Sequence, residues 1–214
     1  MPDRIVLLGG TFDPVHHGHL IVARAVAEAC RYDRITLVPS ASPPHKGSAR
    51  ASGADRLAML RLAVEAEELF DVCDVELRRT GRSYTFDTLL ALRERLGPRT
   101  ELHLVMGADM LADLPNWHRS RELVELARIV VARRPPWQRE WEGIFADLRS
   151  RLGPQAAERL AASVIPTPLI DISSTDIRKR LAEGRSIRFL VPEPVRAFIE
   201  QQGLYGTGGR ESPV

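Results

Sequence analysis

The sequence is poor in several features that identify whole classes of protein. Its 214 residues include two cysteines, Cys30 and Cys73, with no CxxC and no Cys–His spacing, which argues against a disulfide framework and a zinc finger. No apolar run is long enough to cross a membrane. The first apolar segment, residues 5–8, is too short for a secretory signal because glycines end it at once. We therefore expect a cytoplasmic chain that needs neither disulfides nor a membrane.

An excess of charge of one sign is missing too. The chain carries 30 Lys and Arg residues against 28 Asp and Glu residues, a formal net charge of +2. A protein built to bind duplex DNA would show a basic face or tail, so we expect no nucleic acid among the partners. Lysine itself is scarce, since Lys46 and Lys179 are the only two. Each is either a place where an amine is needed or a remnant in an arginine-rich chain.

Apolar runs alternate with amphipathic segments along the chain. Short apolar runs predict strands at residues 5–8, 34–38, 70–77, 102–106, 128–132 and 164–172. Helical spacing of apolar residues predicts helices at 19–29, 54–68, 85–96, 174–182 and 193–202, with an interrupted helical stretch over 139–162. This alternation indicates an α/β fold with a mostly parallel sheet. We expect one domain over residues 1–205 and a disordered Gly-rich tail at 206–214.

Ligands of such sheets bind beyond the carboxyl ends of the strands, which points to the loops after the first, second and fourth strands. The first loop lacks both GxGxxG and GxxxxGK[ST]. Instead His16 and His19 stand at the expected helix start, on one face at the positive end of the helix dipole. Gly9, Gly10 and Gly18 let an anion approach the backbone N–H groups there. This pattern predicts a phosphate site; a zinc site on HxxH and a solvated His-rich turn are the alternatives.

A second candidate anion site lies near the end of the chain, at residues 172–178, ISSTDIR. Ser173 or Ser174, with Asp176 in the first turn, is an ordinary helix N-cap, and that alone explains the serines. It leaves Arg178 unexplained, because this arginine lies one turn into the helix and faces whatever sits at the helix start.

Several segments resemble a known family. Residues 9–20, GGTFDPVHHGHL, resemble the HxGH signature of the nucleotidyltransferase superfamily, and ISSTDIR resembles its second motif, which grips the β- and γ-phosphates of ATP. Three further segments resemble bacterial nicotinate-nucleotide adenylyltransferases: PSxxPPHK at 39–46, ELxRxGxSYTxDTL at 76–89, and GAD at 107–109 with LPxWH at 114–118. The resemblance extends over residues 3 to about 205. It implies a single-domain, Rossmann-like, doubly wound parallel sheet.

The resemblance also implies roles for particular side chains. Catalysis would rest on His16, His19, Lys46 and Arg178. The ATP site would comprise Gly9, Gly10, Thr11, Phe12, His16, His19, Gly107, Asp109, Ile172, Ser173, Ser174 and Arg178. The nicotinate mononucleotide site would comprise His45, Lys46, Tyr84, Thr85, Asp109, Trp117 and Arg134. In it Trp117 would stack on the nicotinate ring and Thr85 would hold the carboxylate.

Some of these residues have plain structural alternatives. Trp117 taken alone is more often a half-buried core ring, and Tyr84 is most simply a packing residue. Thr85 and Asp109 could each cap a helix, and Lys46 could be a solvated loop residue. His118 receives no role, and the sequence leaves open which of Arg133 and Arg134 reaches the site. The apolar residues of 136–154 could form either an amphipathic cover or a partner surface.

The implied reaction joins ATP and nicotinate mononucleotide to give deamido-NAD and pyrophosphate. Mg²⁺ would bridge the triphosphate, held mainly by ATP and water, so we expect no protein metal ligand. The nearest alternative is a sister adenylyltransferase that uses the amide NMN or another mononucleotide. A non-catalytic nucleotide-binding module on the same fold is the alternative from another class. The sequence leaves homo-oligomerisation open.

Overall fold

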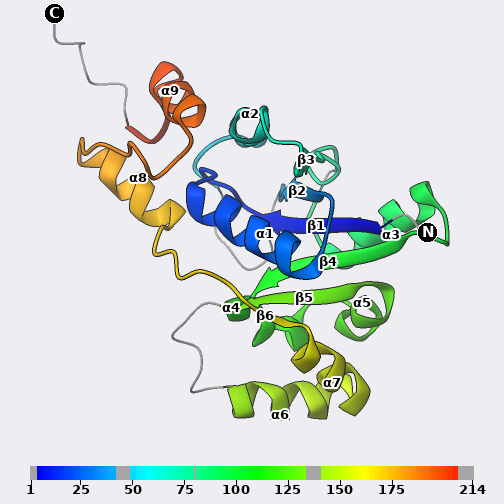
Figure 1. The fold of residues 1–214 in the computed structure, drawn as a ribbon. Helices are drawn as coiled ribbons and strands as arrows, with labels where there is room; N and C mark the ends of the chain where they lie inside the picture. Colours follow the sequence, from blue (N-terminus) through cyan, green and yellow to red (C-terminus); the bar gives the residue numbers. More distant parts are fainter. Residues whose placement is uncertain (1–3, 42–48, 80, 134–140, 207–214) are drawn as a thin grey trace, which may run out of the picture.

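The computed structural model describes residues 4–41, 49–79, 81–133 and 141–206, which form a sheet layered with helices (Figure 1). The strands are β1 (Arg4–Gly10), β2 (Ile35–Pro39), β3 (Phe70–Val72), β4 (Glu101–Gly107), β5 (Arg128–Arg133) and β6 (Val164–Pro166). They lie in the order β3-β2-β1-β4-β5-β6, and all neighbours pair in parallel. The predicted doubly wound α/β fold is confirmed.

The direction of the strand order reverses at β1. The chain moves outward from β1 to β2 and β3, then returns to place β4 on the other side of β1. The crevice beyond the carboxyl ends of β1 and β4 is therefore the switch point at which such sheets bind ligands. Gly10 lies level with Pro39 of β2, and Leu8 lies level with Val105 of β4. The three loops that the sequence indicated thus leave the sheet at the same edge.

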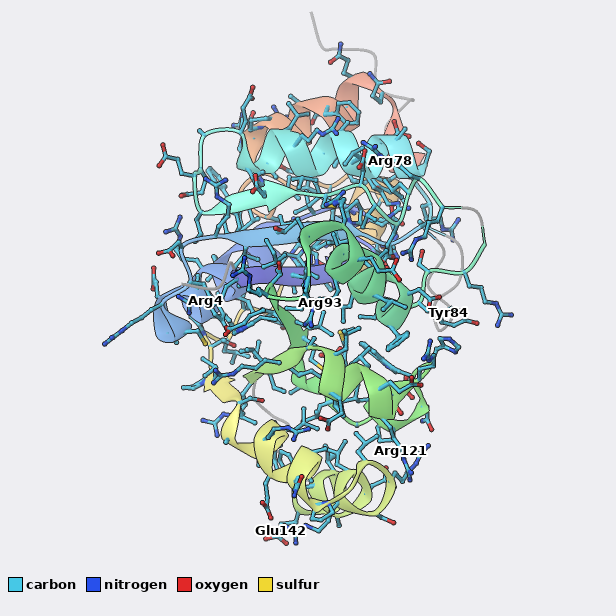
Figure 2. The ribbon with its side chains drawn as sticks, turned by 90° about the vertical axis from the view of Figure 1, so that its right-hand side faces the viewer. Arg4, Arg78, Tyr84, Arg93, Arg121 and Glu142 are labelled. Carbon is cyan, nitrogen blue, oxygen red and sulfur yellow. The ribbon has the colours of Figure 1, made fainter. Side chains whose placement is uncertain are left out.

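Helices cover both faces of the sheet. One core lies under α1 (His17–Cys30), α2 (Gly53–Val64), α8 (Ser174–Ala182) and α9 (Glu193–Gln201). The other lies under α3 (Thr85–Leu96), α4 (Ala108–Leu111), α5 (Ser120–Leu126), α6 (Trp141–Leu152) and α7 (Pro154–Ala162). Val6 and Leu7 join different cores because successive side chains of a strand point to opposite faces. Both views place α2 and α9 at one end of the sheet and α6 and α7 at the other (Figures 1 and 2).

Several expected elements differ from the structure. The strand expected over 70–77 ends at Val72, because this edge strand pairs with β2 over three residues and residues 75–78 then form a turn. The segment expected over 164–172 ends as a strand at Pro166, since proline cannot donate to the ladder. Helix α5 was not predicted. Of the expected tail, Gly206 belongs to the short helix η3 (Leu204–Gly206), and the rest lies outside the described residues.

The described part of the chain contains no helix that is both long and apolar enough to cross a bilayer.

Candidate active site

The loop between β1 and α1 turns sharply at the carboxyl edge of the sheet. Gly10 has no room for a side chain, since a Cβ there would lie 2.9 Å from the ring of Phe12. Phe12 is buried and has a φ of 49°, in the left-handed region that bulky residues rarely adopt. Arg56 of α2 holds the turn, because its Nη1 donates 2.8 Å hydrogen bonds to the backbone oxygens of Thr11 and Ser40. The predicted ATP-binding residues 9–12 therefore lie together at the switch point.

His16 and His19 stand at the start of α1, as predicted. His16 is the N-cap residue with an extended backbone, and the two imidazole rings stack with centroids 3.7 Å apart. The backbone N–H of His16 donates to Nδ1 of His19 over 3.3 Å. Because Nδ1 accepts, neutral His19 carries its proton on Nε2, the nitrogen that can donate to a phosphate oxygen. The pair thus adds an imidazole donor to the positive end of α1.

The structure does not support the two alternatives for these histidines, a solvated turn and a zinc site. His16 is 3% exposed, so the solvated-turn interpretation is wrong for this residue. Over the ranges that the structure describes, no three His, Cys, Asp or Glu side chains gather closely enough to hold a metal ion. Gly18 is required by the stack, since a Cβ there would lie 3.0 Å from the ring of His16.

Helix α8 brings the second motif against the β1–α1 loop. Ser173 caps the helix and accepts a 3.0 Å hydrogen bond from the backbone N–H of Asp176, as the N-cap alternative expects. The hydroxyl of Ser174 instead donates to the backbone oxygen of Pro14 over 2.8 Å, across 160 residues of sequence. Ile172, just before the cap, packs against the core on the α1 side. The two predicted anion-binding motifs therefore meet at one loop.

Arg178 completes this junction from the first turns of α8. Its Nη1 donates to the backbone oxygen of Asp13 over 2.6 Å, and its Nη2 donates to Oγ1 of Thr175 over 3.2 Å. The side chain is 27% exposed, so part of the guanidinium faces solvent. The structure thus brings a cation to the β1–α1 loop, where the triphosphate is expected.

Sequence reasoning missed Asp13, on which the junction centres. Its buried carboxylate accepts from the backbone N–H groups of Arg50 over 2.7 Å and Ala51 over 3.1 Å. It also accepts from the hydroxyl of Tyr205 over 2.6 Å, and Nη1 of Arg178 lies 3.9 Å from the same carboxylate. No local pattern could have indicated this set, because its partners come from three distant segments.

Two further buried charges escaped the sequence reasoning. Burial raises the pKa of Glu76, and hydrogen bonds from Thr88 and Ser83 oppose that shift. Oγ of Ser83 also accepts from the backbone N–H of Ala41 over 3.2 Å, which ties the loop after β2 to the start of α3. Burial likewise lowers the pKa of Arg56, and Asp13 opposes the shift. The sequence held one signal of the burial of Arg56, because this residue stands at helical spacing from the buried apolar residues of α2.

The expected nicotinate side is built by two segments that touch. Tyr84 is the N-cap of α3, and its ring centroid lies 4.4 Å from that of His118 (Tyr84 is labelled in Figure 2). Thr85 is the first helical residue, so the N-cap alternative for Thr85 is wrong. Trp117 is half-buried and packs against the core on the α3 side. The guanidinium of Arg119 lies 4.0 Å above the ring of Phe86, a second contact between the two segments.

Asp109 follows the carboxyl end of β4. It is exposed and lies in the first turn of α4, whose N-cap is Gly107, so Asp109 does not cap this helix. Its Oδ1 bends back over the strand end, since a Cβ at Gly107 would lie 2.3 Å from that oxygen. The glycine therefore gives the carboxylate of Asp109 room to stand over the carboxyl end of β4, at the switch point of the sheet.

A polar cavity of about 510 Å³ lies beside Trp117, between the short helix η1 (Leu114–Asn116), α5 and α6. Trp117, Arg119, Arg121 and Arg151 are among the residues that line it. Helix α6 covers the core here, because Leu148 is fully buried and the stacked rings of Trp141 and Phe145 pack against the same cluster.

Three predicted residues, His45, Lys46 and Arg134, lie outside the described residues. Arg133 is the last residue of β5, and its backbone oxygen accepts from the hydroxyl of Thr167 over 3.0 Å. The choice between Arg133 and Arg134 therefore stays open.

Comparison with known proteins agrees with this architecture. Residues 7–180 match the cytidylyltransferase-like family. A protein of Thermomicrobium roseum named "Probable nicotinate-nucleotide adenylyltransferase" is 43% identical over 96% of this chain and 92% of its own. A protein of Pseudomonas syringae pv. tomato with the same name is 44% identical over 96% of this chain and 95% of its own.

Solved structures support the fold. Nicotinic acid mononucleotide adenylyltransferase of Plasmodium falciparum, complexed with NaAD, superposes with a TM-score of 0.76. The match covers 95% of this chain and 97% of that chain at 19% identity, so it supports the fold alone. The sequence relatives cover nearly the whole chain at more than 40% identity, and they decide the family. The chain belongs to the nicotinate-nucleotide adenylyltransferase family, within the cytidylyltransferase-like proteins.

Proposed function

We propose that this protein transfers the AMP group of ATP to nicotinate mononucleotide, giving deamido-NAD and pyrophosphate. The observation that carries the proposal is the meeting of the histidine-capped start of α1 with Arg178 of α8 at the switch point of the sheet. The predicted enzyme class is confirmed by near-full-length relatives that bear its name. We assign the activity to one domain, residues 1–205, acting in the cytoplasm.

The reaction needs no general base. A phosphate monoester loses its second proton near pH 6, so the attacking oxygen of the mononucleotide is already ionised at neutral pH. That oxygen forms a bond to the α-phosphorus of ATP, the bond from this phosphorus to the bridging oxygen breaks, and pyrophosphate leaves with the electron pair. The obstacle is repulsion between two polyanions. Catalysis therefore consists of holding them in line and neutralising charge.

The described residues can supply that neutralisation from two helix starts. We assign Nε2 of His19, with the backbone N–H groups at the start of α1, to the phosphate oxygens of ATP. Ser173 and Ser174 at the start of α8, with Arg178, face the leaving pyrophosphate in this scheme. Lys46 is assigned to the mononucleotide phosphate as an expectation from the sequence.

A divalent metal ion accompanies ATP in phosphoryl and nucleotidyl transfer, and we propose Mg²⁺ here. The ion neutralises triphosphate charge when bound. Asp13 is unsuited to hold it, because its carboxylate already accepts three hydrogen bonds and faces Arg178. The donor set near the loop thus fits an ion that arrives on ATP and keeps water ligands.

The pyridine side of the site follows from the two touching segments. Trp117 would offer a ring face for stacking, and the start of α3 would offer Thr85 and backbone N–H groups to the nicotinate carboxylate. Asp109 would accept from ribose hydroxyls. An acid fits these donors better than an amide does, because a charged acceptor strengthens each hydrogen bond.

The deciding experiment supplies ATP and Mg²⁺ with either nicotinate mononucleotide or its amide, NMN, and measures pyrophosphate release. We expect kcat/KM to be higher with the acid by roughly tenfold or more. An equal or greater value with the amide would reassign the substrate. Absence of release with both compounds would indicate a nucleotide-binding protein without this activity.

A further inference from the structure

Asp13 connects four segments beside the residues expected to bind the triphosphate. It lies in the β1–α1 loop, and its backbone N–H partners, Arg50 and Ala51, lie before α2. Its third donor is Tyr205, which belongs to η3 and follows α9. Its fourth contact is Arg178 of α8, whose Nη1 lies 3.9 Å from Oδ2. A buried carboxylate with donors on both oxygens is a fixed point for these segments.

Tyr205 is held at Asp13 in a conformation that tyrosine rarely adopts. Its φ is 59°, in the left-handed region, where a bulky side chain costs free energy. Its hydroxyl lies 2.6 Å from Oδ1 of Asp13. Burial, followed by the hydrogen bond to Asp13, raises the pKa of Tyr205, so the hydroxyl keeps its proton and donates. Such strain persists where the surroundings impose it, and it concentrates at functional sites.

Arg178 takes its position from the same residue. Nη1 of Arg178 donates to the backbone oxygen of Asp13 over 2.6 Å, in addition to facing the carboxylate. Nη2 is directed to Thr175 on the preceding turn of α8. The position of the guanidinium at the loop thus depends on where Asp13 stands.

We propose that Tyr205 and Asp13 form a latch that positions Arg178 for ATP. The latch joins the C-terminal segment to the β1–α1 loop and fixes the guanidinium beside the start of α1. This inference rests on the proposed function, since it serves the ATP site of that reaction. Both residues act through Arg178 and the loop, so they are positioning residues.

Removal of the Tyr205 hydroxyl has a defined consequence. Oδ1 of Asp13 would keep one donor, the backbone N–H of Ala51, in place of two. A carboxylate with fewer donors attracts Arg178 more strongly and draws the guanidinium away from the triphosphate. The affinity for ATP falls, while the pyridine side of the site, built from α3 and residues 117–119, keeps its contacts.

The test uses the whole protein with the substitution Tyr205→Phe, which removes one oxygen atom. We expect the KM for ATP to rise about 3- to 10-fold with the KM for nicotinate mononucleotide unchanged. The Kd of a non-hydrolysable ATP analogue, measured by calorimetry, should rise by the same factor. In the Arg178→Ala background, Tyr205→Phe should add no further effect, because the latch acts through that arginine.

Tyr32→Phe is the matched control. Tyr32 is also buried, and its hydroxyl also lies 2.6 Å from a polar partner, Nδ1 of His103, but the pair lies at the amino edge of the sheet. We expect it to lower thermal stability without changing either KM. Equal changes in both KM values for Tyr205→Phe, no change, or additivity with Arg178→Ala would each overturn the latch. A wild-type protein that binds no ATP analogue would instead overturn the proposed function.

Discussion

The two edges of the sheet each hold a buried polar cluster, and the clusters differ in what they connect. At the amino edge, the hydroxyl of Tyr32 lies 2.6 Å from Nδ1 of His103, whose Nε2 lies 3.6 Å from Glu101 (Figure 2 labels Arg4, where β1 begins). At the carboxyl edge, Asp13 and Arg56 bind backbone groups of loops that follow β1 and β2. One cluster ties the segment that follows α1 to β4, and the other fixes loops at the switch point.

The difference shows that burial of a polar group does not by itself indicate function. Both clusters contain buried polar groups that form hydrogen bonds, which favour stability. Only the carboxyl-edge cluster lies beside two helix N-termini and a reversal of strand order, where an anion can bind. Substitutions at the carboxyl edge should therefore change kinetics, and substitutions at the amino edge should change stability alone.

The largest effect should follow from His19→Ala at the carboxyl edge. Loss of the Nε2 donor at the start of α1 should lower kcat roughly 10²- to 10³-fold, the range for removal of one transition-state donor. Thermal unfolding should change little, because His19 is only half-buried. The measurement is steady-state pyrophosphate release beside a melting curve. An undiminished kcat would show that His19 does not act on the phosphates. It would also contradict the expected difference between the carboxyl and amino edges of the sheet.

Trp117→Ala should have the next largest effect. Loss of the stacking face should raise the KM for nicotinate mononucleotide about 10- to 100-fold, since base–aromatic stacking contributes about 1–3 kcal/mol. The KM for ATP should rise far less. Steady-state titration of each substrate checks this, and Phe145→Leu on α6, which alters the same core without entering the site, is the control. Equal rises in the KM values for ATP and nicotinate mononucleotide would show that Trp117 does not stack on the nicotinate ring.

Gly107→Ala should have a smaller effect on kinetics. Its φ of −74° suits alanine, but the new Cβ would lie 2.3 Å from Oδ1 of Asp109 and displace that carboxylate. We expect kcat/KM to fall about tenfold through loss of a charge-assisted hydrogen bond to ribose. Gly143→Ala on α6 is the control, since a Cβ there meets nothing within 4 Å. Equal kcat/KM values for the two variants would refute the role of Asp109.

The smallest effect should come from His103→Gln at the amino edge. Burial, followed by the charge of Arg128, lowers the pKa of His103 in the folded protein, and Glu101 opposes this. As pH falls through about 6.5, the unfolded chain takes up a proton on His103 that the folded chain does not, so stability is lost towards acid. The variant should lose this part of the pH dependence. Melting temperatures at pH 5.5 and 7.5 test the slope, and kcat at pH 7.5 should stay unchanged.

Local patterns predicted most of the fold. The helices expected over 85–96 and 174–182 have those bounds, because apolar periodicity and glycine or serine signals at helix ends are local properties. Helix α5, with seven residues, is too short to show a clear period, and β3 ends early because pairing at a sheet edge is decided by the neighbour. The roles of His16, His19, Trp117 and the other site residues remain predictions.

The sequence by itself determined the α/β class, the loops that bear the site, and the family, because these rest on periodicity and on motifs of contiguous residues. It also placed two imidazoles at a helix start through a spacing of three. Only the tertiary structure decided that Asp13 joins the β1–α1 loop to the segments that carry Arg50, Arg178 and Tyr205. The partners of Asp13 lie 37, 165 and 192 residues away, and such contacts are set by the way α8 and η3 meet the β1–α1 loop, which no local pattern records.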